Sequence, residues 1–273
     1  QNNRRDEVII ATKVAGEGYA NVRDGAPISR ETITIAVENS LRSMRTDYID
    51  LYQLHWPNRG SYMFRKNWHY DPTNQNKAET LAHMTEVLNC LEDLRKQGKI
   101  RQFGLSNESS WGTAQWLRIS EELDLPRAVS IQNEYSLMCR LFDTDLAELC
   151  HNEQVGLLAF SPLACGVLSG KYEGGNATPQ GSRKSIGADL GGRVNPRMWP
   201  AVDAYLDIAK RHAIDPVQLA IAWTLTRPFM ASSIIGATST EQLATVLGAT
   251  EITLGDDVLA EIDAAHRAHP MPY

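Results

Sequence analysis

Short apolar segments alternate with amphipathic helical patterns along most of this chain of 273 residues. The short segments are rich in β-branched and aromatic residues, which is typical of strands that are buried on both faces. Repeated alternation of strand and helix predicts a parallel sheet with right-handed crossovers. We expect strands near residues 7–14, 48–55, 100–106, 128–134, 155–161 and 232–237.

The helical patterns between these segments have recognisable ends. Ser29 is expected to be an N-cap, with Thr32 three residues later, before a face formed by Ile33, Val37 and Leu41. The next pattern covers residues 78–97 and stops at Gly98. Further helices are expected at 109–123, 143–153, 197–213, 216–226, 240–248 and 256–267.

Two parallel architectures fit this alternation, an open doubly wound sheet and a closed (β/α)8 barrel. An open sheet that binds a dinucleotide usually carries G-x-G-x-x-G after its first strand, and none occurs here. A barrel gathers its chemistry at the carboxyl ends of its strands. We therefore predict one domain over 1–273, a (β/α)8 TIM barrel with about six of its eight strands visible. Polar residues follow nearly every strand: Lys13, His55, Ser106, Asn107, Gln132, Asn133, Ser161 and Thr238.

Composition excludes several classes of function. A net charge of -6 and a pI of about 5.7 argue against binding to nucleic acid or to an anionic membrane. No apolar stretch approaches the roughly 18 residues of a membrane span, and the polar start, residues 1–6, does not resemble a signal peptide. The four cysteines lack CxxC or zinc-like spacing, which favours free thiols and a cytoplasmic location.

Lys13 and His55 are the ionisable residues that end two of the apolar runs. Lys13 could form a Schiff base, tune the pKa of a neighbouring acid, or be a solvated lysine. His55 could orient a carbonyl, act as acid or base, bind a metal, or cap its strand. Parity places Lys13 on the face of Ala11, and His55 on that of Gln53. No HExxH, GxSxG or P-loop is present, which favours metal-free, non-hydrolytic chemistry.

The remaining strand ends suit a flat, phosphorylated ligand. Ser106, Asn107 and Gln132 could pair with a carboxamide, although Asn107 could also cap a helix. Phe160 could stack on a ring. Residues 164–171 resemble a loop able to cross a pyrophosphate, and residues 236–242 run from a strand into a helix N-terminus that suits phosphate.

Taken in order, these stretches resemble the aldo-keto reductase family, and most closely bacterial NADP(H)-dependent members related to the potassium-channel β subunits. The resemblance covers essentially the whole chain. The matching stretches are IATK (10–13), DYIDLYQLHWP (47–57), GKIRQFGLSN (98–107), QNEYS (132–136), FSPL (160–163), GVLSGKY (166–172) and IGAT (235–238).

The resemblance implies an extended NADPH that transfers hydride to an aldehyde or ketone, without a metal. Lys13 matches the family's lysine and His55 its carbonyl-orienting histidine. The long loop after His55 is expected to line the substrate pocket through Trp56 and Tyr62. For the cofactor, the resemblance assigns Ser106, Asn107 and Gln132 to the nicotinamide amide, Phe160 to the ring, Ser161, Leu163, Gly166 and Leu168 to the pyrophosphate, and Gly236, Thr238, Ser239 and Gln242 to the adenosine 2′-phosphate.

The chain departs from the family at both ends of the proposed site. The family's acid Tyr and its Asp lie in a D-x-A-x-x-Y pattern that does not occur here, and its Glu-Asn after the matching Gln is replaced by Thr245-Val246. We expect an N-terminal segment that carries the first two strands, and poor turnover without it.

The sequence thus predicts a reductase of small-molecule carbonyls that binds neither nucleic acid nor membrane and is compatible with a homo-oligomer. A cofactor-holding regulatory module with little turnover and a Schiff-base aldolase that uses Lys13 are the alternatives.

Overall fold

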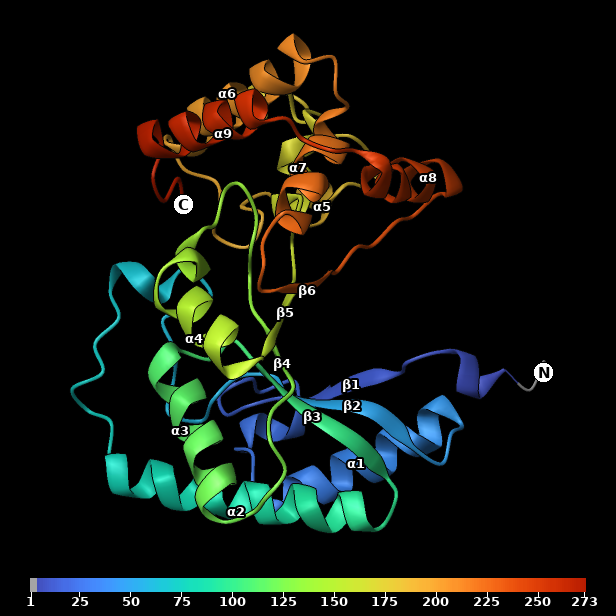
Figure 1. Ribbon diagram of the computed structural model, residues 1–273, viewed down its shortest axis with the longest axis vertical. Helices are drawn as coiled ribbons and strands as arrows, with labels where there is room; N and C mark the ends of the chain where they lie inside the picture. The colour runs from blue at the N-terminus through green and yellow to red at the C-terminus, as the bar shows by residue number, and fades with distance from the viewer. Residues whose placement is uncertain (1–3) are drawn as a thin grey trace. The chain divides into compact units, whose positions relative to one another are not determined.

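The computed structural model describes residues 4–273 and contains six strands in that range (Figure 1). Strand β1 pairs with β2, β2 with β3, β3 with β4, and β5 with β6, and all four pairings are parallel. The predicted fold class, a parallel α/β sheet, is therefore confirmed. The strands are Ala11–Val14 (β1), Ile49–Leu54 (β2), Ile100–Ser106 (β3), Ser130–Gln132 (β4), Gly156–Ala159 (β5) and Met230–Ser233 (β6).

Helices separate the strands, as the sequence predicts. Ser29 caps the first one, since its side chain accepts a hydrogen bond from the Thr32 N–H while Thr32 bonds back to the Ser29 N–H. The helices are Arg30–Met44 (α1), Lys77–Lys96 (α2), Ser110–Glu122 (α3), Asp145–Glu153 (α4), Arg183–Ile186 (α5), Met198–Arg211 (α6), Pro216–Leu225 (α7), Thr240–Gly248 (α8) and Asp256–Ala268 (α9).

The chain forms two compact units. The first comprises the described residues through Gln132 together with Glu153–Val155, and the second comprises Asn133–Asn152 and Gly156–Tyr273. We describe each unit by itself.

The first unit contains β1 to β4. In the register of these strands, Lys13 lies opposite Gln53, and Gln53 lies opposite Gly104. Ser106 lies opposite Gln132 in the next pair. Because the strands are parallel, their carboxyl ends meet at one edge, and this edge carries the polar residues identified from the sequence.

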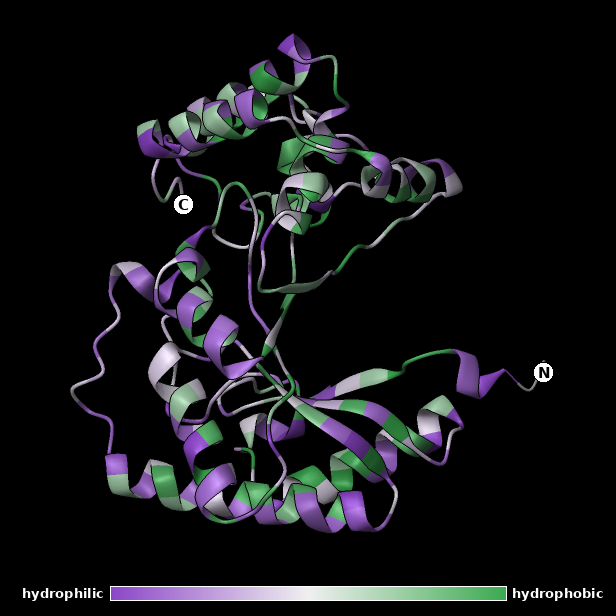
Figure 2. Cartoon of the chain, viewed as in Figure 1, coloured by the Kyte–Doolittle hydropathy of each residue, from purple (hydrophilic) through white to green (hydrophobic). Residues whose placement is uncertain are grey.

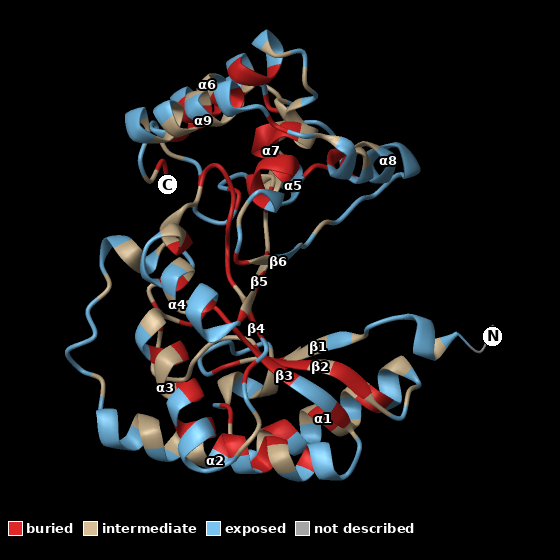
Figure 3. Cartoon of the chain, in the orientation of Figure 1, coloured by how far each residue is buried: buried red, intermediate tan, exposed pale blue. Residues whose placement is uncertain are grey.

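Helices α1 and α2 cover one face of β1 to β3 (Figure 1). Figure 2 shows apolar stretches on both helices, and Figure 3 shows that β2 is buried along most of its length. The apolar contributions from the helices include Ile33 and Val37 of α1 and Leu88 and Leu91 of α2, which have no exposed surface. This packing fixes where the strand ends lie.

The second unit contains β5 and β6, with α7 as its most buried helix (Figure 3). An aromatic cluster forms part of its core, in which Tyr135 stacks on Trp223 with ring centroids 5.3 Å apart. Phe142 and Phe229 pack against the same tyrosine at 6.2 and 5.7 Å.

The four cysteines are free thiols, which confirms the prediction from their spacing.

Several predicted strands were too long or shifted at their ends; the fifth, for example, covers only Gly156–Ala159 rather than 155–161. The first strand begins at Ala11 rather than near residue 7, because Val8 and Ile9 are 53% and 82% exposed. The fourth is limited to Ser130–Gln132. The last lies at 230–233 rather than 232–237: β5 ends at Ala159, so the ladder stops where Ile234 donates to the Ala159 carbonyl.

The N-cap of α1 gives a first test of this fold. Ser29→Ala removes the side-chain acceptor of the capping box, and we expect it to lower the free energy of unfolding by about 1 kcal/mol. Urea unfolding followed by circular dichroism measures the change. Ser43→Ala, at an exposed position in the same helix, is the control and should change stability by less than about 0.5 kcal/mol. Equal effects of the two substitutions would contradict the assigned cap.

Candidate active site

Lys13 and His55 lie together at the carboxyl edge of the first unit. Lys13 belongs to β1 and pairs in register with Gln53, two residues before His55 on the same face of β2. The His55 N–H donates to the Val14 carbonyl at 2.9 Å, which continues the β1–β2 ladder by one residue. The structure therefore brings the two ionisable residues singled out in the sequence onto neighbouring strand ends.

Burial lowers the pKa of both groups, and His55 is also affected by the positive charge of Lys13. His55 is half-buried, and its pKa is lowered to about 4, chiefly by desolvation and then by the positive charge of Lys13. Desolvation also lowers the pKa of Lys13. The imidazole is consequently neutral at pH 7, where it can donate one ring N–H and accept at the other nitrogen.

A hydrogen-bond network joins the ends of β2, β3 and β4. The Asn107 Nδ2 donates to the His55 carbonyl at 2.9 Å and to Ser106 Oγ at 3.1 Å. Ser106 Oγ in turn donates to the Gln132 carbonyl at 2.8 Å. Asn107 adopts a φ of 51°, in the left-handed region that asparagine tolerates better than most residues. Ser106, Asn107 and Gln132 thus lie together at this edge.

This network leaves an acceptor unused. Asn107 is 2% exposed, and its Oδ1 has no hydrogen-bond partner within residues 4–273. A buried polar atom without a partner is costly unless a ligand or water satisfies it. The Gln132 side chain is half-buried at the next strand end. A carboxamide, which offers both N–H donors and a carbonyl acceptor, fits this donor and acceptor set.

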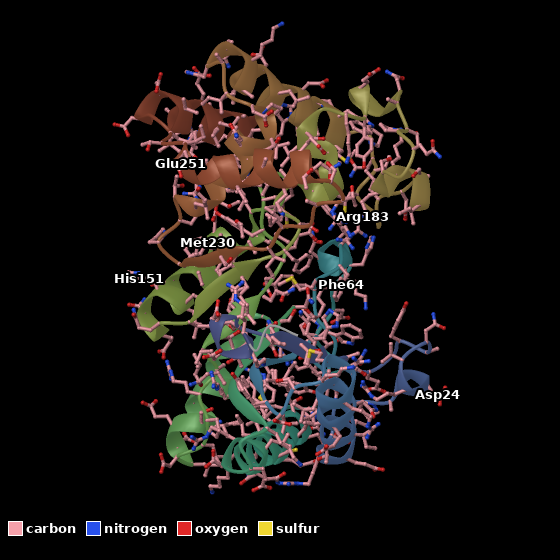
Figure 4. The ribbon with its side chains drawn as sticks, turned by 90° about the vertical axis from the view of Figure 1, so that its right-hand side faces the viewer. Asp24, Phe64, His151, Arg183, Met230 and Glu251 are labelled. Carbon is pink, nitrogen blue, oxygen red and sulfur yellow. The ribbon has the colours of Figure 1, made fainter. Side chains whose placement is uncertain are left out.

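A cleft of about 450 Å³ lies between the loop after β2 and the start of α2. Trp56 lines it, and its Nε1 donates to the Glu17 carbonyl at 3.0 Å. Tyr62 is not among the lining residues and instead packs edge-on against Tyr70 at 5.9 Å. Phe64, labelled in Figure 4, packs edge-on against Trp56 at 6.1 Å. Of the two expected substrate contacts, only Trp56 reaches this cleft.

The loop after β2 is anchored by a buried ion pair that sequence reasoning missed. Arg59 bonds to Glu108, with side chains 8% and 3% exposed, and Glu108 also accepts from the Trp116 indole at 3.2 Å. Gln53 was also overlooked: it is 1% exposed, and its Nε2 lacks a partner within the described range. The parity that relates His55 to Gln53 is a signal that could have identified it.

In the second unit, Phe160 and the residues after it form a tight turn. The Phe160 N–H donates to the Asn133 carbonyl at 3.1 Å, and its own carbonyl accepts from the Tyr135 N–H at 3.3 Å. The turn Ala164–Ser169 follows, and the Leu163 carbonyl accepts from the Gly166 N–H at 2.8 Å and the Leu168 N–H at 3.3 Å.

Positive φ angles mark this turn. Ser161 has a φ of 55°, Cys165 one of 59° and Gly166 one of 87°. Such a run of left-handed backbone can turn successive N–H groups toward one side, an arrangement known to favour anions. Gly166 and Leu168 lie within this turn, and Ser161 and Leu163 come just before it, although the Leu168 side chain itself is buried.

The segment Gly236–Gln242 leads into α8. Ser239 is the N-cap of this helix and accepts from the Gln242 N–H at 3.3 Å. Gln242 Oε1 accepts from both the N–H and the hydroxyl of Thr238 at 3.1 Å. Gly236, Thr238, Ser239 and Gln242 are exposed, and a helix N-terminus favours a bound anion.

Two features are absent from residues 4–273. No helix in this range is long and apolar enough to cross a membrane. No group of three or more His, Cys, Asp or Glu side chains in the same range could hold a metal ion.

Comparison with known proteins identifies the family. The model of the Aldo/keto reductase family matches residues 1–267. This chain belongs to that family. The family has the (β/α)8 barrel fold, with which the parallel strands and their intervening helices agree.

Several named relatives support the assignment. The chain is 40% identical over 275 residues to Protein tas of Escherichia coli (strain K12), which covers 100% of this chain and 78% of that protein. It is 35% identical to an aldo-keto reductase of Babesia bovis, over 95% of this chain and 96% of that protein. An uncharacterized oxidoreductase, YrpG of Bacillus subtilis (strain 168), is 29% identical over 94% of this chain and 71% of its own length. Family and relatives together support a general oxidoreductase role, and members of the family generally use a nicotinamide cofactor.

The coupling between Lys13 and His55 can be tested by titration. Lys13→Met removes the positive charge, so we expect the pKa of His55 to rise from about 4 but to stay below 6.5, since burial is the larger cause. NMR of the imidazole protons against pH measures it, with Lys77→Met at an exposed helix start as the control. An unchanged pKa in Lys13→Met would contradict the proximity of the two groups.

The same shift affects stability. Between pH 6.5 and about 4 the unfolded state binds a proton at His55 more readily than the folded state does. The contribution of neutral His55 to the free energy of unfolding should therefore be complete above pH 6.5 and decrease as the pH falls toward 4. Urea unfolding of wild type and His55→Gln at several pH values measures it, and parallel pH profiles would contradict the shift.

Proposed function

We propose that this protein binds NADP(H) and uses it to reduce an aldehyde or ketone to an alcohol. The observation that carries the proposal is the pairing of Lys13 with a neutral His55 beside the strand-end amides Asn107 and Gln132. The bound cofactor would supply the hydride, while the protein positions the reacting groups and controls their charge.

His55 and Lys13 would act on the carbonyl group. Because the imidazole is neutral at pH 7, its N–H can orient the carbonyl oxygen by a hydrogen bond without being a strong acid. The ammonium of Lys13 would stabilise negative charge that develops on that oxygen as the hydride arrives. The proton that completes the alcohol would come from solvent water, since Tyr19, Tyr52, Tyr62 and Tyr135 do not match the family's acid.

The residues present fit the cofactor. In the first unit, the unpartnered Asn107 Oδ1 and the Gln132 side chain would bind the nicotinamide carboxamide, and Ser106 would hold Asn107 in place. The resemblance further assigns Phe160 to ring stacking and Ser161, Leu163, Gly166 and Leu168 to the pyrophosphate, and these residues all belong to the second unit.

A preference for NADP(H) over NAD(H) would depend on α8. Ser239 and Thr238 offer hydroxyl groups at the N-terminus of this helix. Gln242 holds Thr238 through two hydrogen bonds, and Gly236 lies in the segment that leads to this helix. The helix N–H groups would favour the additional negative charge of a 2′-phosphate.

Substrate contacts would come from the loop after β2. Trp56 is half-buried, and its ring lies 4.6 Å from the His55 ring, so it is placed to pack against a carbonyl compound held at His55. Tyr62 belongs to the same loop and is proposed as a second, more distant contact.

One observation favours a second function. A half-buried lysine with a lowered pKa is the nucleophile that a Schiff-base aldolase needs. Borohydride treatment in the presence of a ketone or aldehyde distinguishes the two functions: a reduced adduct on Lys13 would support the aldolase, and its absence alongside NADPH-dependent alcohol formation would support the reductase.

The nicotinamide site predicts a change in cofactor affinity. Gln132→Met keeps the length of the side chain but removes the amide, and we expect the Kd for NADPH to rise about tenfold, the loss of roughly 1.5 kcal/mol. Titration of NADPH fluorescence measures it. Gln102→Met, at an exposed position on β3, is the matched control and should leave the Kd unchanged. Equal affinities of both variants and wild type would contradict the proposed contact.

Lys13 predicts an effect on turnover that is separate from binding. Lys13→Met should lower the rate of aldehyde-dependent NADPH oxidation about 100-fold, while the Kd for NADPH changes less than about threefold. Absorbance at 340 nm gives the rate, and Lys77→Met is the control. Tight NADPH binding by wild type without measurable turnover would instead favour the cofactor-holding module.

A further inference from the structure

A buried cluster in the second unit joins three segments that are far apart in sequence. Glu134 follows β4, Arg193 lies in the last part of the long segment 173–196, and Tyr273 lies beyond α9. Arg193 donates to Glu134 Oε1 from Nε at 3.0 Å and from Nη2 at 2.7 Å. The Tyr273 hydroxyl donates to the same oxygen at 3.1 Å.

The three side chains of the cluster are buried. The Arg193 and Glu134 side chains are 6% and 7% exposed, and Tyr273 is 6% exposed. The guanidinium lies 5.5 Å from the centre of the Tyr273 ring, and a further bond runs from Arg193 Nη1 to the Leu190 carbonyl at 2.7 Å. Burial raises the pKa of Tyr273 and the adjacent Glu134 carboxylate raises it further, so its hydroxyl remains a donor. Removing one partner of a buried charge pair strongly destabilises the folded state, because the other charge is left without compensation.

The cluster adjoins the residues assigned to the cofactor. Glu134 forms a parallel bridge with Phe160, so its main chain is fixed to the ring-stacking candidate. The Tyr172 hydroxyl, directly before the long segment, donates to the Cys165 carbonyl within the turn Ala164–Ser169 at 3.1 Å. The long segment starts just after this turn. Figure 4 marks the segment at Arg183.

We propose that Glu134, Arg193 and Tyr273 form a latch that holds segment 173–196 in place beside the turn Ala164–Ser169, and that this preorganisation sets the affinity for the cofactor. The first part of this proposal, the latch itself, is independent of the proposed function. The second part, the effect on cofactor affinity, rests on it and is called the cofactor half below. A segment already ordered before binding loses less conformational entropy when the ligand arrives. Tyr273 and Arg193 are then positioning residues and contact no reacting atom.

The latch is tested by tryptic cleavage without cofactor. Arg183 and Lys184 are trypsin sites within the segment. Tyr273→Phe removes only the hydroxyl donor, and we expect cleavage after these residues to become about tenfold faster. Tyr205→Phe is the matched control, because Tyr205 is equally buried and its hydroxyl has no partner within residues 4–273. Arg193→Lys, which keeps the charge but loses the two-pronged geometry, provides a second variant if Tyr273→Phe fails to fold.

The cofactor half is tested by NADPH fluorescence titration on the same variants. Tyr273→Phe and Arg193→Lys should raise the Kd for NADPH about fivefold to tenfold while kcat changes less than twofold, whereas Tyr205→Phe changes neither. Cleavage at the rate of Tyr205→Phe would overturn the latch. Faster cleavage with an unchanged Kd would overturn its link to the cofactor. Wild type that does not bind NADPH at all would overturn the proposed function, while the cleavage rates would still decide whether the latch exists.

Discussion

The parallel register of β1, β2 and β3 is the constraint on which the first unit depends. Register determines which side chains share a face and how far each strand extends, and a shift of one residue would turn Lys13 and His55 to opposite faces. The helices α1 and α2 bury their apolar faces against these strands and so oppose such a shift. Asn107 adds a local restraint, since its amide bonds to the main chain of His55 and ties the end of β2 to the end of β3. The packing of α1 and α2 against the strands therefore determines where Lys13 and His55 lie at the carboxyl edge of the sheet.

The same edge illustrates how a fold sets the charges of its own functional groups. In water an imidazole with a pKa near 6.5 would be partly protonated at neutral pH. Placed beside an ammonium and half removed from solvent, His55 stays neutral down to about pH 4. Burial also lowers the pKa of Lys13. Among the described residues, no ion pair joins Lys13 to a carboxylate that would oppose this decrease. A site with this charge pattern attracts electron-rich groups, which agrees with a carbonyl oxygen as the proposed ligand.

Sequence reasoning was most successful where local rules and burial agree. The alternation of strand and helix, the cap at Ser29 and the polar strand ends all follow from patterns of a few residues, and the structure contains each of them. Strand ends were less predictable, because Val8 and Ile9 have the composition of a strand but no neighbouring strand to pair with among residues 4–273. Tyr62 was placed by loop membership alone, and the loop turns it toward Tyr70. The buried pair of Arg59 and Glu108 joins residues separated by 49 positions, and no local pattern reports such a contact.

The Glu134–Arg193–Tyr273 cluster shows why some positioning devices are visible only in three dimensions. None of these residues has a distinctive neighbour pattern, and each would be interpreted separately as a solvated or core side chain. Their meaning comes from the shared oxygen Glu134 Oε1, which accepts from both the guanidinium and the phenol. Such a buried acceptor satisfies two donors only when all three segments are in place, so its formation is cooperative. If cofactor binding requires the segment 173–196 to be ordered, the cluster lowers the entropic cost of binding. The affinity for the cofactor then depends on residues that do not contact it.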